Sequence, residues 1–160
     1  MEEITLDDIK CSYCNETKCI SQTIGIHRAP EILVINLMRF NNGNENKKLN
    51  TFIKFPINGL IIKEGSTNQN IEYKLYGVIN YIDTSEKGYY NCIIKTAETK
   101  WIKFNILQIE EINEDEETIV TSSSHTLIYS RKQSHLSESS VKNLIAFLIE
   151  KETNFQVKKF

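Results

Sequence analysis

The sequence predicts an α+β domain built mainly on antiparallel sheet. Short segments rich in β-branched and aromatic residues recur along the chain, with polar loops between them, and this spacing is typical of antiparallel strands. One amphipathic helix is predicted close to the C-terminus, over residues 137–153. The 160 residues, 40% of them hydrophobic, are enough for one globular domain with a substantial core.

The first strong strand covers residues 32–37, which are nearly all Ile, Leu and Val. Such a run is expected in a strand that is buried on both faces, and the Asn-rich turn at 41–44 should follow it. Because Pro56 has no N–H to donate to a ladder, the strand before it should end at a sheet edge or a bend. The other predicted strands are residues 52–55, 59–62, 73–81, 90–94, 101–104 and 125–129.

Two polar stretches are predicted to lie outside the sheet. Residues 65–70 have the composition of a surface turn, and residues 110–117 contain six acidic side chains. A solvated loop is the ordinary structure of such an acidic run, and an acidic docking site is the less frequent one. We therefore expect residues 110–117 to be a loop.

The predicted C-terminal helix has its apolar residues at helical spacing. Ser139 or Ser140 is suited to cap it, because a serine side chain accepts a hydrogen bond from the first turn. Its apolar stripe is expected either to pack on the chain's own sheet or, as the second alternative, to bind a partner. The stripe consists of Val141, Leu144, Ile145 and Leu148, broadened by Phe147 and Ile149.

Charge and hydropathy exclude several classes of function. A formal net charge of -2 does not form the basic surface that nucleic-acid binding requires. The longest apolar runs are much shorter than the roughly 20 residues of a membrane span, and the acidic start of the chain is unlike a secretory signal. We therefore expect no nucleic acid and no membrane among the partners, and a location in the cytosol or nucleus.

Three of the four cysteines, Cys11, Cys14 and Cys19, lie within nine residues of one another. In a reducing compartment thiols stay available as metal ligands, so this clustering indicates a metal site or its remnant. Cys92 lies in a predicted strand and is expected to be a small buried residue.

Several blocks in a fixed order resemble the C-terminal half of a ubiquitin-specific protease domain. They cover roughly residues 9–131, and an ordered series is more specific than any one motif. The blocks are Cys11-Ser12-Tyr13-Cys14, Pro30 with residues 32–37, Arg39-Phe40, Lys54-Phe55-Pro56, residues 73–80, Gly88-Tyr89-Tyr90, residues 101–105 and Leu127-Ile128-Tyr129.

The resemblance implies a fold and a division of the chain. The fold is part of a papain-like cysteine protease, namely the palm and part of the fingers, without the helical N-terminal lobe. Residues 1–131 would form this lobe, with 1–20 as a remnant of the zinc-binding fingers, and residues 132–160 a tail that carries the helix. Family members hydrolyse the bond after the C-terminal glycine of ubiquitin with a Cys nucleophile, a His base and an Asp or Asn that orients the His.

This chain departs from the family pattern at its catalytic positions. Tyr89 stands where the family has its catalytic histidine, and a phenol with a pKa near 10 is a poor base at pH 7. An earlier family histidine is replaced by Tyr81. Asn105 stands at the Asp or Asn position but has no imidazole to orient. No cysteine occurs in the context of the nucleophile box, and none of the three histidines, His27, His125 and His135, stands at the base position.

The zinc site implied by the resemblance is incomplete. Structural zinc needs four ligands, and Cys11 with Cys14 supplies half of them. Cys19 and His27 would complete an unusual Cys3His set. The alternatives are a lost site with free thiols, or a half-site completed by another chain.

Three functions follow from these residues. The first is a catalytically inactive lobe that binds ubiquitin, a ubiquitinated protein or another partner. The alternative is an active cysteine-type deubiquitinase whose Cys-box half is on another chain or missing from the gene prediction. The third is a decayed fragment, for which poor solubility would be expected from an unpaired sheet.

Overall fold

The fold was analysed on a computed structural model, which describes residues 2–40, 48–83, 88–97, 100–105 and 108–132, together with positions 139, 143, 146 and 147. The side chains of residues 2–8, 18–23 and 97 are outside this description. The predicted turn at 41–44, the Cys19 side chain, His135 and most of the C-terminal helix therefore lie outside the described residues.

Nine strands and one short helix make up the described chain. Nearly all of its regular secondary structure is β, as the recurrence of short β-rich segments predicts. The elements are β1 (Glu2–Lys10), β2 (Thr17–Ile24), β3 (Ile32–Asn36), β4 (Asn58–Lys63), β5 (Asn70–Ile82), β6 (Tyr89–Ala97), β7 (Lys100–Asn105), β8 (Gln108–Ile112), α1 (Glu116–Ile119) and β9 (Ser124–Arg131).

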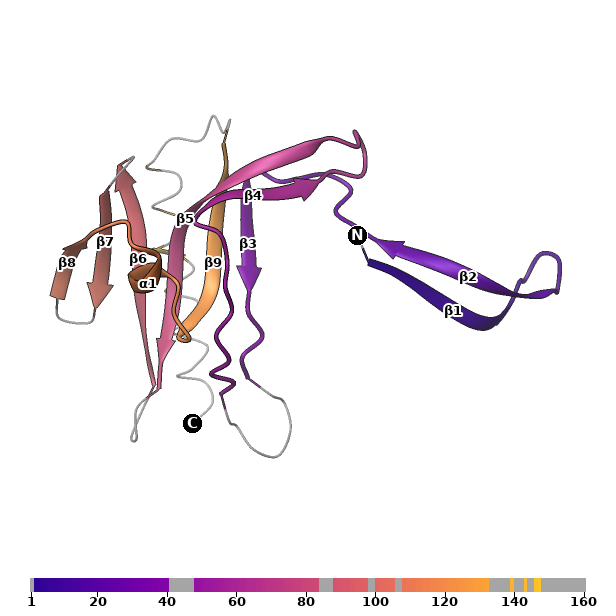
Figure 1. Ribbon diagram of the computed structural model, residues 1–160, viewed down its shortest axis with the longest axis horizontal. Helices are drawn as coiled ribbons and strands as arrows, with labels where there is room; N and C mark the ends of the chain where they lie inside the picture. The colour runs from indigo at the N-terminus through magenta and orange to yellow at the C-terminus, as the bar shows by residue number, and fades with distance from the viewer. Residues whose placement is uncertain are drawn as a thin grey trace. The chain divides into compact units, whose positions relative to one another are not determined.

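The main sheet has seven strands in the order β3-β9-β5-β6-β7-β8, with β4 paired to β5 outside this path. Every neighbouring pair along the path is antiparallel. Figure 1 shows the same order, and both figures show α1 on one face of the sheet. The predicted sheet-rich α+β architecture is confirmed.

The chain divides into two compact units, which are described separately. One consists of Met1–Ala29 and Ile61–Ile71 and contains the β1–β2 hairpin. In it, the Ala29 N–H donates to Glu64 Oε1 at 2.8 Å and the Gly65 N–H donates to the Ile26 carbonyl at 2.8 Å. The other unit, Pro30–Leu60 and Glu72–Phe160, contains most of the main sheet and the candidate site.

Side chains alternate between the two faces of the main sheet. Lys95 of β6 forms an ion pair with Glu114, just before α1, so the side of β6 that carries Lys95 is called here the α1 face. By alternation Tyr89, Asn91 and Ile93 lie on the α1 face. Tyr90, Cys92 and Ile94 lie on the opposite face, as do Ile79 and Phe104, which are paired with Cys92 in the register.

The prediction that residues 32–37 form a strand buried on both faces is wrong in its burial. β3 forms as expected, but it is the edge strand of the sheet, with β9 as its neighbour on the path. Its side chains are half-buried or exposed, and Val34 is 41% exposed. An edge strand lacks cover from a second neighbour, which hydrophobic content alone does not reveal.

The predicted strand at 52–55 does not form in the structure. Hydrogen bonds hold the chain just after this segment instead: the Tyr129 hydroxyl donates to the Pro56 carbonyl at 2.7 Å, and the Leu75 N–H donates to the Ile57 carbonyl at 2.8 Å. Phe55 is buried while Phe52 is exposed. The segment therefore packs against the sheet without joining its ladder.

The prediction that 110–117 is a loop is also wrong. Residues up to Ile112 belong to β8, which pairs with β7, and α1 begins at Glu116. Asp115 caps α1, because its side chain accepts a hydrogen bond from the Glu117 N–H. The expected exposure is confirmed for most of these side chains. Among the described residues, no helix is long and apolar enough to cross a bilayer.

Candidate functional site

Tyr89 and Asn105, the two residues singled out by the sequence, lie at one end of two neighbouring strands. Tyr89 begins β6 and Asn105 ends β7. The register pairs Cys92 with Phe104, so one further step places Asn105 opposite Asn91. Asn91 and Tyr89 are two residues apart in one strand, and thus Asn105 and Tyr89 share the α1 face. Tyr89 is half-buried and Asn105 is exposed.

A row of side-chain amides crosses the α1 face next to Tyr89. Asn80 is paired with Asn91 between β5 and β6, and Asn105 is paired with Gln108 between β7 and β8. Asn80 Nδ2 donates to Asn91 Oδ1 at 2.9 Å, and both side chains are buried. Asn80 Oδ1 is buried without a hydrogen-bond partner. Asn80 and Asn91 were not among the predicted site residues, although two amides at core positions of apolar strands are a visible signal.

The opposite face at this end of the sheet carries four aromatic rings. The Tyr81 ring lies 5.1 Å from Phe40 and 5.0 Å from Tyr90, between centroids. The His125 ring lies 5.8 Å from Phe40 and 5.9 Å from Tyr90. Such edge and tilted contacts contribute roughly 0.5–1.5 kcal/mol each beyond apolar burial. Tyr81 therefore serves as a packing residue here.

Two buried cations brace the aromatic cluster. Lys48 Nζ donates to the Tyr81 carbonyl at 2.5 Å and lies 5.2 Å from the centroid of the Tyr81 ring. Arg39 donates to three carbonyls, those of Ser124 at 2.5 Å, Leu49 at 2.9 Å and Thr51 at 2.7 Å. Desolvation lowers the pKa of both cations, and the charge of Arg39 also lowers that of Lys48. Hydrogen bonding to carbonyls holds these charges inside the fold.

His125 is a buried, satisfied histidine, as the sequence analysis expected for a histidine outside the base position. It is 5% exposed, and its Nδ1 lies 3.1 Å from Thr126 Oγ1. Burial lowers its pKa, and the charges of Lys48 and Arg39 lower it further. Its contact with Tyr90 places the imidazole on the opposite face from Tyr89. His27 belongs to the hairpin-containing unit and is exposed.

Cys92 is buried, as predicted. Burial raises the pKa of its thiol to about 11, and a hydrogen bond with the Phe104 backbone offsets this in part. A thiol with this pKa is almost entirely protonated at pH 7 and is a poor nucleophile. Because Cys92 lies on the opposite face from Tyr89, it does not meet the candidate site.

Cys11 and Cys14 lie in the turn between β1 and β2. The Cys11 N–H donates to the Glu16 carbonyl at 2.9 Å, and the Asn15 N–H donates back to the Cys11 carbonyl at 2.9 Å. Backbone hydrogen bonds from Cys14 and Tyr13 lower the pKa of the Cys11 thiol. Donors of this kind favour a thiolate, the form that binds metals. Among the described side chains no group of three or more potential metal ligands occurs.

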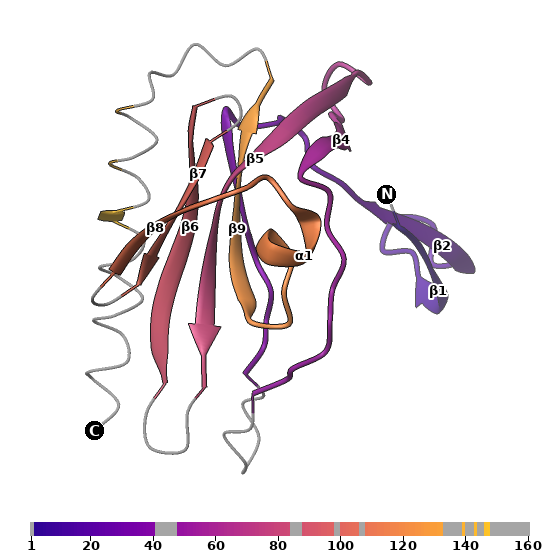
Figure 2. The same cartoon turned by 60° about the vertical axis from the view of Figure 1, so that its left-hand side comes forward.

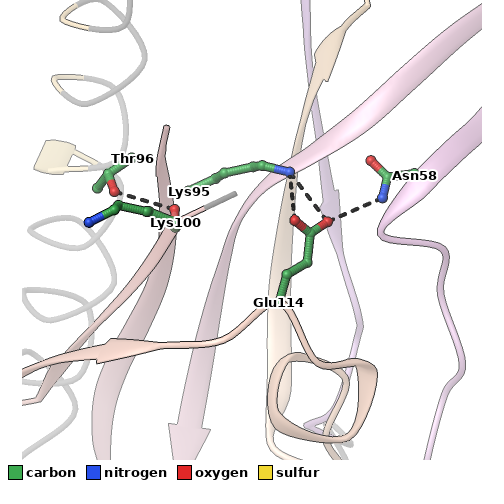
Figure 3. Close-up of polar contacts among 5 residues, drawn as sticks. All are labelled: Asn58, Lys95, Thr96, Lys100 and Glu114. Carbon is green, nitrogen blue, oxygen red and sulfur yellow. Dashed lines mark hydrogen bonds and ion pairs between the residues drawn. The ribbon is translucent and has the colours of Figure 1, made fainter. Parts of the chain in front are cut away.

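Glu114 fastens the segment before α1 to the sheet. Lys95 Nζ lies 3.3 and 3.2 Å from its two carboxylate oxygens, and Asn58 Nδ2 donates to Oε1 at 3.3 Å (Figure 3). Lys95 also lies 5.3 Å from the centre of the Trp101 ring, which is fully buried. The network holds α1 over the sheet. It was not predicted, because its members are distant from one another in the chain.

The arrangement around Tyr89 suits hydrogen bonding better than proton transfer. The amide row offers both donors and acceptors and does not titrate near neutral pH. His125, the described imidazole of the same unit, lies on the opposite face from Tyr89.

Comparison with protein families finds one match across most of the chain. The sequence model of the family described as ubiquitin carboxyl-terminal hydrolase matches residues 2–129. Ubiquitin carboxyl-terminal hydrolase 5 of Arabidopsis thaliana is 34% identical over 128 residues, 76% of this chain and 14% of the relative. Ubiquitin carboxyl-terminal hydrolase 8 of Saccharomyces cerevisiae is 29% identical over 136 residues, 77% of this chain and 28% of the relative.

Solved structures give the same result for the fold. A chain of the yeast SAGA DUB module superposes with a TM-score of 0.69 at 31% identity, covering 84% of this chain and 31% of that one. A SAGA DUB module bound to monoubiquitin gives a TM-score of 0.68 at 29% identity, with the same coverage. The papain-like fold expected from the resemblance is thus confirmed. The chain spans between about a seventh and a third of the length of these relatives.

Proposed function

Because this chain belongs to the ubiquitin carboxyl-terminal hydrolase family, whose members include the ubiquitin-specific proteases, we propose that it is a ubiquitin-binding lobe without hydrolytic activity of its own. The observation that carries the proposal is the surroundings of Tyr89. A phenol occupies the place expected for the base, and the described imidazole of the same unit, His125, is packed on the opposite face. Its place of action would be the cytosol or nucleus.

One further observation supports an inactive site, and one expected feature of the site is retained. The described thiol closest in sequence to Tyr89, that of Cys92, is buried and has a raised pKa. Asn105 retains the amide expected at the orienting position, and it lies on the same face as Tyr89 in a row with other amides. Loss of members of a catalytic triad lowers turnover by roughly 10⁴ to 10⁶.

The first experiment measures hydrolysis. The purified full chain is incubated with ubiquitin that carries a fluorogenic C-terminal amide. The yeast SAGA DUB module serves as the positive control. We expect no release of fluorophore above the uncatalysed rate, for the chain as it is and for the variant Tyr89→His. Release by the unmodified chain that disappears in Asn105→Ala would overturn the proposal.

The second experiment measures binding. Isotope-labelled ubiquitin is titrated with the full chain, and its NMR shifts are followed. We place the contact at the Tyr89 end of the α1 face, where Asn105 and Gln108 are exposed. Asn105→Lys should weaken binding roughly tenfold or more, because it puts a charge into the contact.

A matched control separates this contact from a general effect of added charge. Asn113→Lys introduces the same side chain at an exposed position just beyond the far end of β8 and should leave binding unchanged. Absence of ubiquitin shifts with a chain that is folded by circular dichroism would contradict the binding role. Such a result would favour the decayed fragment.

A second function is an active deubiquitinase whose Cys-box half is supplied by another chain. The limited coverage of the relatives, 14% and 28% of their lengths, favours a test of this alternative. The N-terminal half of the yeast relative is mixed with this chain and the fluorogenic amide is added. Activity is expected only with Tyr89→His, and activity with Tyr89 intact would overturn the proposal of an inactive site.

We also propose that residues 1–20 are a remnant of zinc-binding fingers, with Cys11 and Cys14 as half of the ligand set. The backbone donors at Cys11 fit a thiolate ligand, but two sulfurs do not complete a tetrahedral site. Metal analysis of the full chain tests this. Any bound zinc should be lost in Cys11→Ser and Cys14→Ser and retained in the control Cys92→Ser.

A further inference from the structure

β4 begins with an Asn-Gly pair that lies at the surface. Asn58 and Gly59 are the first two residues of the strand, and both are exposed. One other glycine of the chain follows an asparagine, namely Gly43 after Asn42, and that pair lies outside the described residues. Within the part of the chain that the structure describes, Asn58-Gly59 is therefore the one Asn-Gly pair in contact with water.

The backbone at position 59 selects glycine. Gly59 has φ +75°, in the left-handed region that residues with a side chain seldom adopt. A Cβ atom built there would meet no atom within 4 Å outside the adjoining residues, so the reason for glycine is the backbone conformation and not packing. Because position 59 has no side chain, the Asn58 carboxamide has free access to the Gly59 backbone nitrogen.

An asparagine before a glycine places an electrophile beside a nucleophile. The electrophile is the side-chain carbonyl carbon of Asn58, and the nucleophile is the backbone nitrogen of Gly59. Attack of one on the other closes a succinimide ring within the chain, and reacting groups that are held together in this way react much faster than separate molecules. Asparagine is accordingly a chemically labile residue.

The Asn58 side chain belongs to the network of Figure 3, in which it points toward Glu114. Asn58 Nδ2 donates to Glu114 Oε1 at 3.3 Å, and Lys95 Nζ lies 3.3 and 3.2 Å from the two oxygens of the same carboxylate. Glu114 is thus held by one amide donor and one cation. A change of Asn58 from a donor to an anion would reverse the first of these contacts.

We infer that Asn58 is a site of spontaneous deamidation, and that its product is a carboxylate which faces Glu114 and loosens the segment before α1. The Gly59 nitrogen forms a bond to the Asn58 side-chain carbonyl carbon, the bond from that carbon to Nδ2 breaks, and ammonia leaves with the proton of the Gly59 N–H. Water then opens the succinimide ring. Cleavage of the new bond gives aspartate, and cleavage of the original peptide bond gives isoaspartate.

The new carboxylate weakens the contact between β4 and the segment before α1. It cannot donate to Glu114, it repels that carboxylate, and it competes with it for Lys95. A neighbouring ion pair, Lys54 with Glu116 at 3.0 Å, has side chains that are 74% and 53% exposed and contributes little. The inference does not rest on the proposed function, because the reaction would occur in an active or an inactive lobe.

Peptide mass spectrometry of the stored full chain measures the reaction. The purified chain is kept in neutral buffer, sampled over weeks, and digested under acidic conditions that suppress further deamidation. The Asn58 peptide should convert to aspartate and isoaspartate together, and faster at higher pH, because the attacking nitrogen must lose its proton. Direct hydrolysis of the amide would give aspartate alone. That outcome, or a peptide that stays unchanged, would overturn the inference.

The variant Gly59→Asn tests the role of the glycine. It keeps the Asn58 amide but places a side chain beside the attacking nitrogen, and asparagine tolerates a positive φ better than most residues. Deamidation at Asn58 should slow roughly tenfold or more, because the access that glycine allows is lost. The peptide with Asn42 is the internal standard and should react equally in both chains.

Equal rates at Asn58 in the two chains would contradict attack by the Gly59 nitrogen. Circular dichroism verifies that the variant is folded. If Gly59→Asn does not fold, Gly59→Asp takes its place with the same expectation, because aspartate also tolerates this backbone conformation.

The variant Asn58→Asp reproduces the aspartate product and tests its effect on the fold. Its urea midpoint at neutral pH should fall by roughly 0.5 M. Asn68→Asp adds the same charge at another exposed asparagine and should leave the midpoint unchanged. In the background Glu114→Gln, Asn58→Asp should cost little or nothing, because the opposing carboxylate is gone. An equal fall in both backgrounds would overturn the proposed loosening of the segment before α1.

Discussion

Tyr81 lies so close to the backbone of Gly88 that a Cβ atom at position 88 would stand 1.8 Å from the Tyr81 hydroxyl oxygen and 2.1 Å from Cζ. Tyr81 is buried and in contact with Phe40, Tyr90 and the Lys48 ammonium group, so its ring is not free to move aside. Position 88 therefore requires glycine, because a Cβ atom there would clash with the Tyr81 side chain of the neighbouring strand. The contact joins the two strands just before the candidate site.

The first prediction is that Gly88→Ala destabilises the chain by about 1–3 kcal/mol, the usual cost of overpacking. The free energy of unfolding is measured in urea. In the background Tyr81→Leu the same substitution should cost much less, because the ring that meets the new methyl group is gone. Additive effects of the two substitutions would show that Tyr81 is not the cause.

The second prediction concerns the amide pair beside Tyr89. Asn91→Leu removes the acceptor of Asn80 Nδ2 while Asn80 Oδ1 already lacks a partner, so stability should fall by about 1–3 kcal/mol. The double variant Asn80→Val with Asn91→Leu removes both polar groups and should recover most of this loss. If urea unfolding shows that the double variant is the less stable of the two, the pair does not act as a hydrogen-bonded unit.

The third prediction follows from His125. Burial and the charges of Lys48 and Arg39 lower its pKa in the folded chain, whereas the unfolded value is about 6.5. Between these two values the unfolded chain binds more protons, so stability is complete above about pH 6.5 and decreases as the pH falls toward the folded value.

The slope should be up to about 1.4 kcal/mol per pH unit for this one group. Urea unfolding between pH 7.5 and 5 measures it. His125→Gln removes the titrating group and should flatten that part of the profile, whatever its effect on stability at pH 7.5. A profile that is equally steep in His125→Gln would assign the dependence to other groups.

The fourth prediction concerns Glu114. Partial burial alone would raise its pKa, but the hydrogen bonds from Asn58 and Lys95 and the charge of Lys95 outweigh burial, so the pKa is lowered from 4.5. Its contribution is therefore present above about pH 4.5 and is lost as the pH falls through the lower folded value. Glu114→Gln should cost roughly 0.5–1 kcal/mol at pH 7 and nothing at acidic pH.

Glu111→Gln is the matched control for this prediction. Its partner Lys100 lies 3.3 Å away, but both side chains are more than 60% exposed, so the pair is screened by solvent. We expect no measurable change in stability at either pH. A cost for Glu111→Gln as large as that for Glu114→Gln would show that the network in Figure 3 has no special role.

Most strands could be predicted because their signal is local. The runs at 73–81, 90–94, 101–104 and 125–129 all lie within observed strands, as β-branched content and alternation indicate. The family was also identified from ordered blocks of sequence, and the comparison confirmed it. The roles of Tyr89 and Asn105 as replaced catalytic positions remain predictions for the experiments above.

The errors concern properties that a local pattern does not contain. The hydrophobic run of β3 predicts a central strand, but its place at the edge depends on which strands pair with β9. Residues 52–55 have strand composition, yet no neighbouring strand offers them a ladder. The acidic run at 110–117 reads as a loop, whereas pairing with β7 and the Asp115 cap organise it into β8 and α1.

By itself, the sequence determined the β-rich composition and the family, and it shows a tyrosine at position 89, because these depend on residue identity and short-range order. The tertiary structure decided which polar groups meet. The Asn80–Asn91 pair, the carbonyl contacts of Lys48 and Arg39, and the position of His125 on the face opposite Tyr89 arise from strand order and register. These are set by long-range pairing, in which a shift of one residue moves every side chain to the other face.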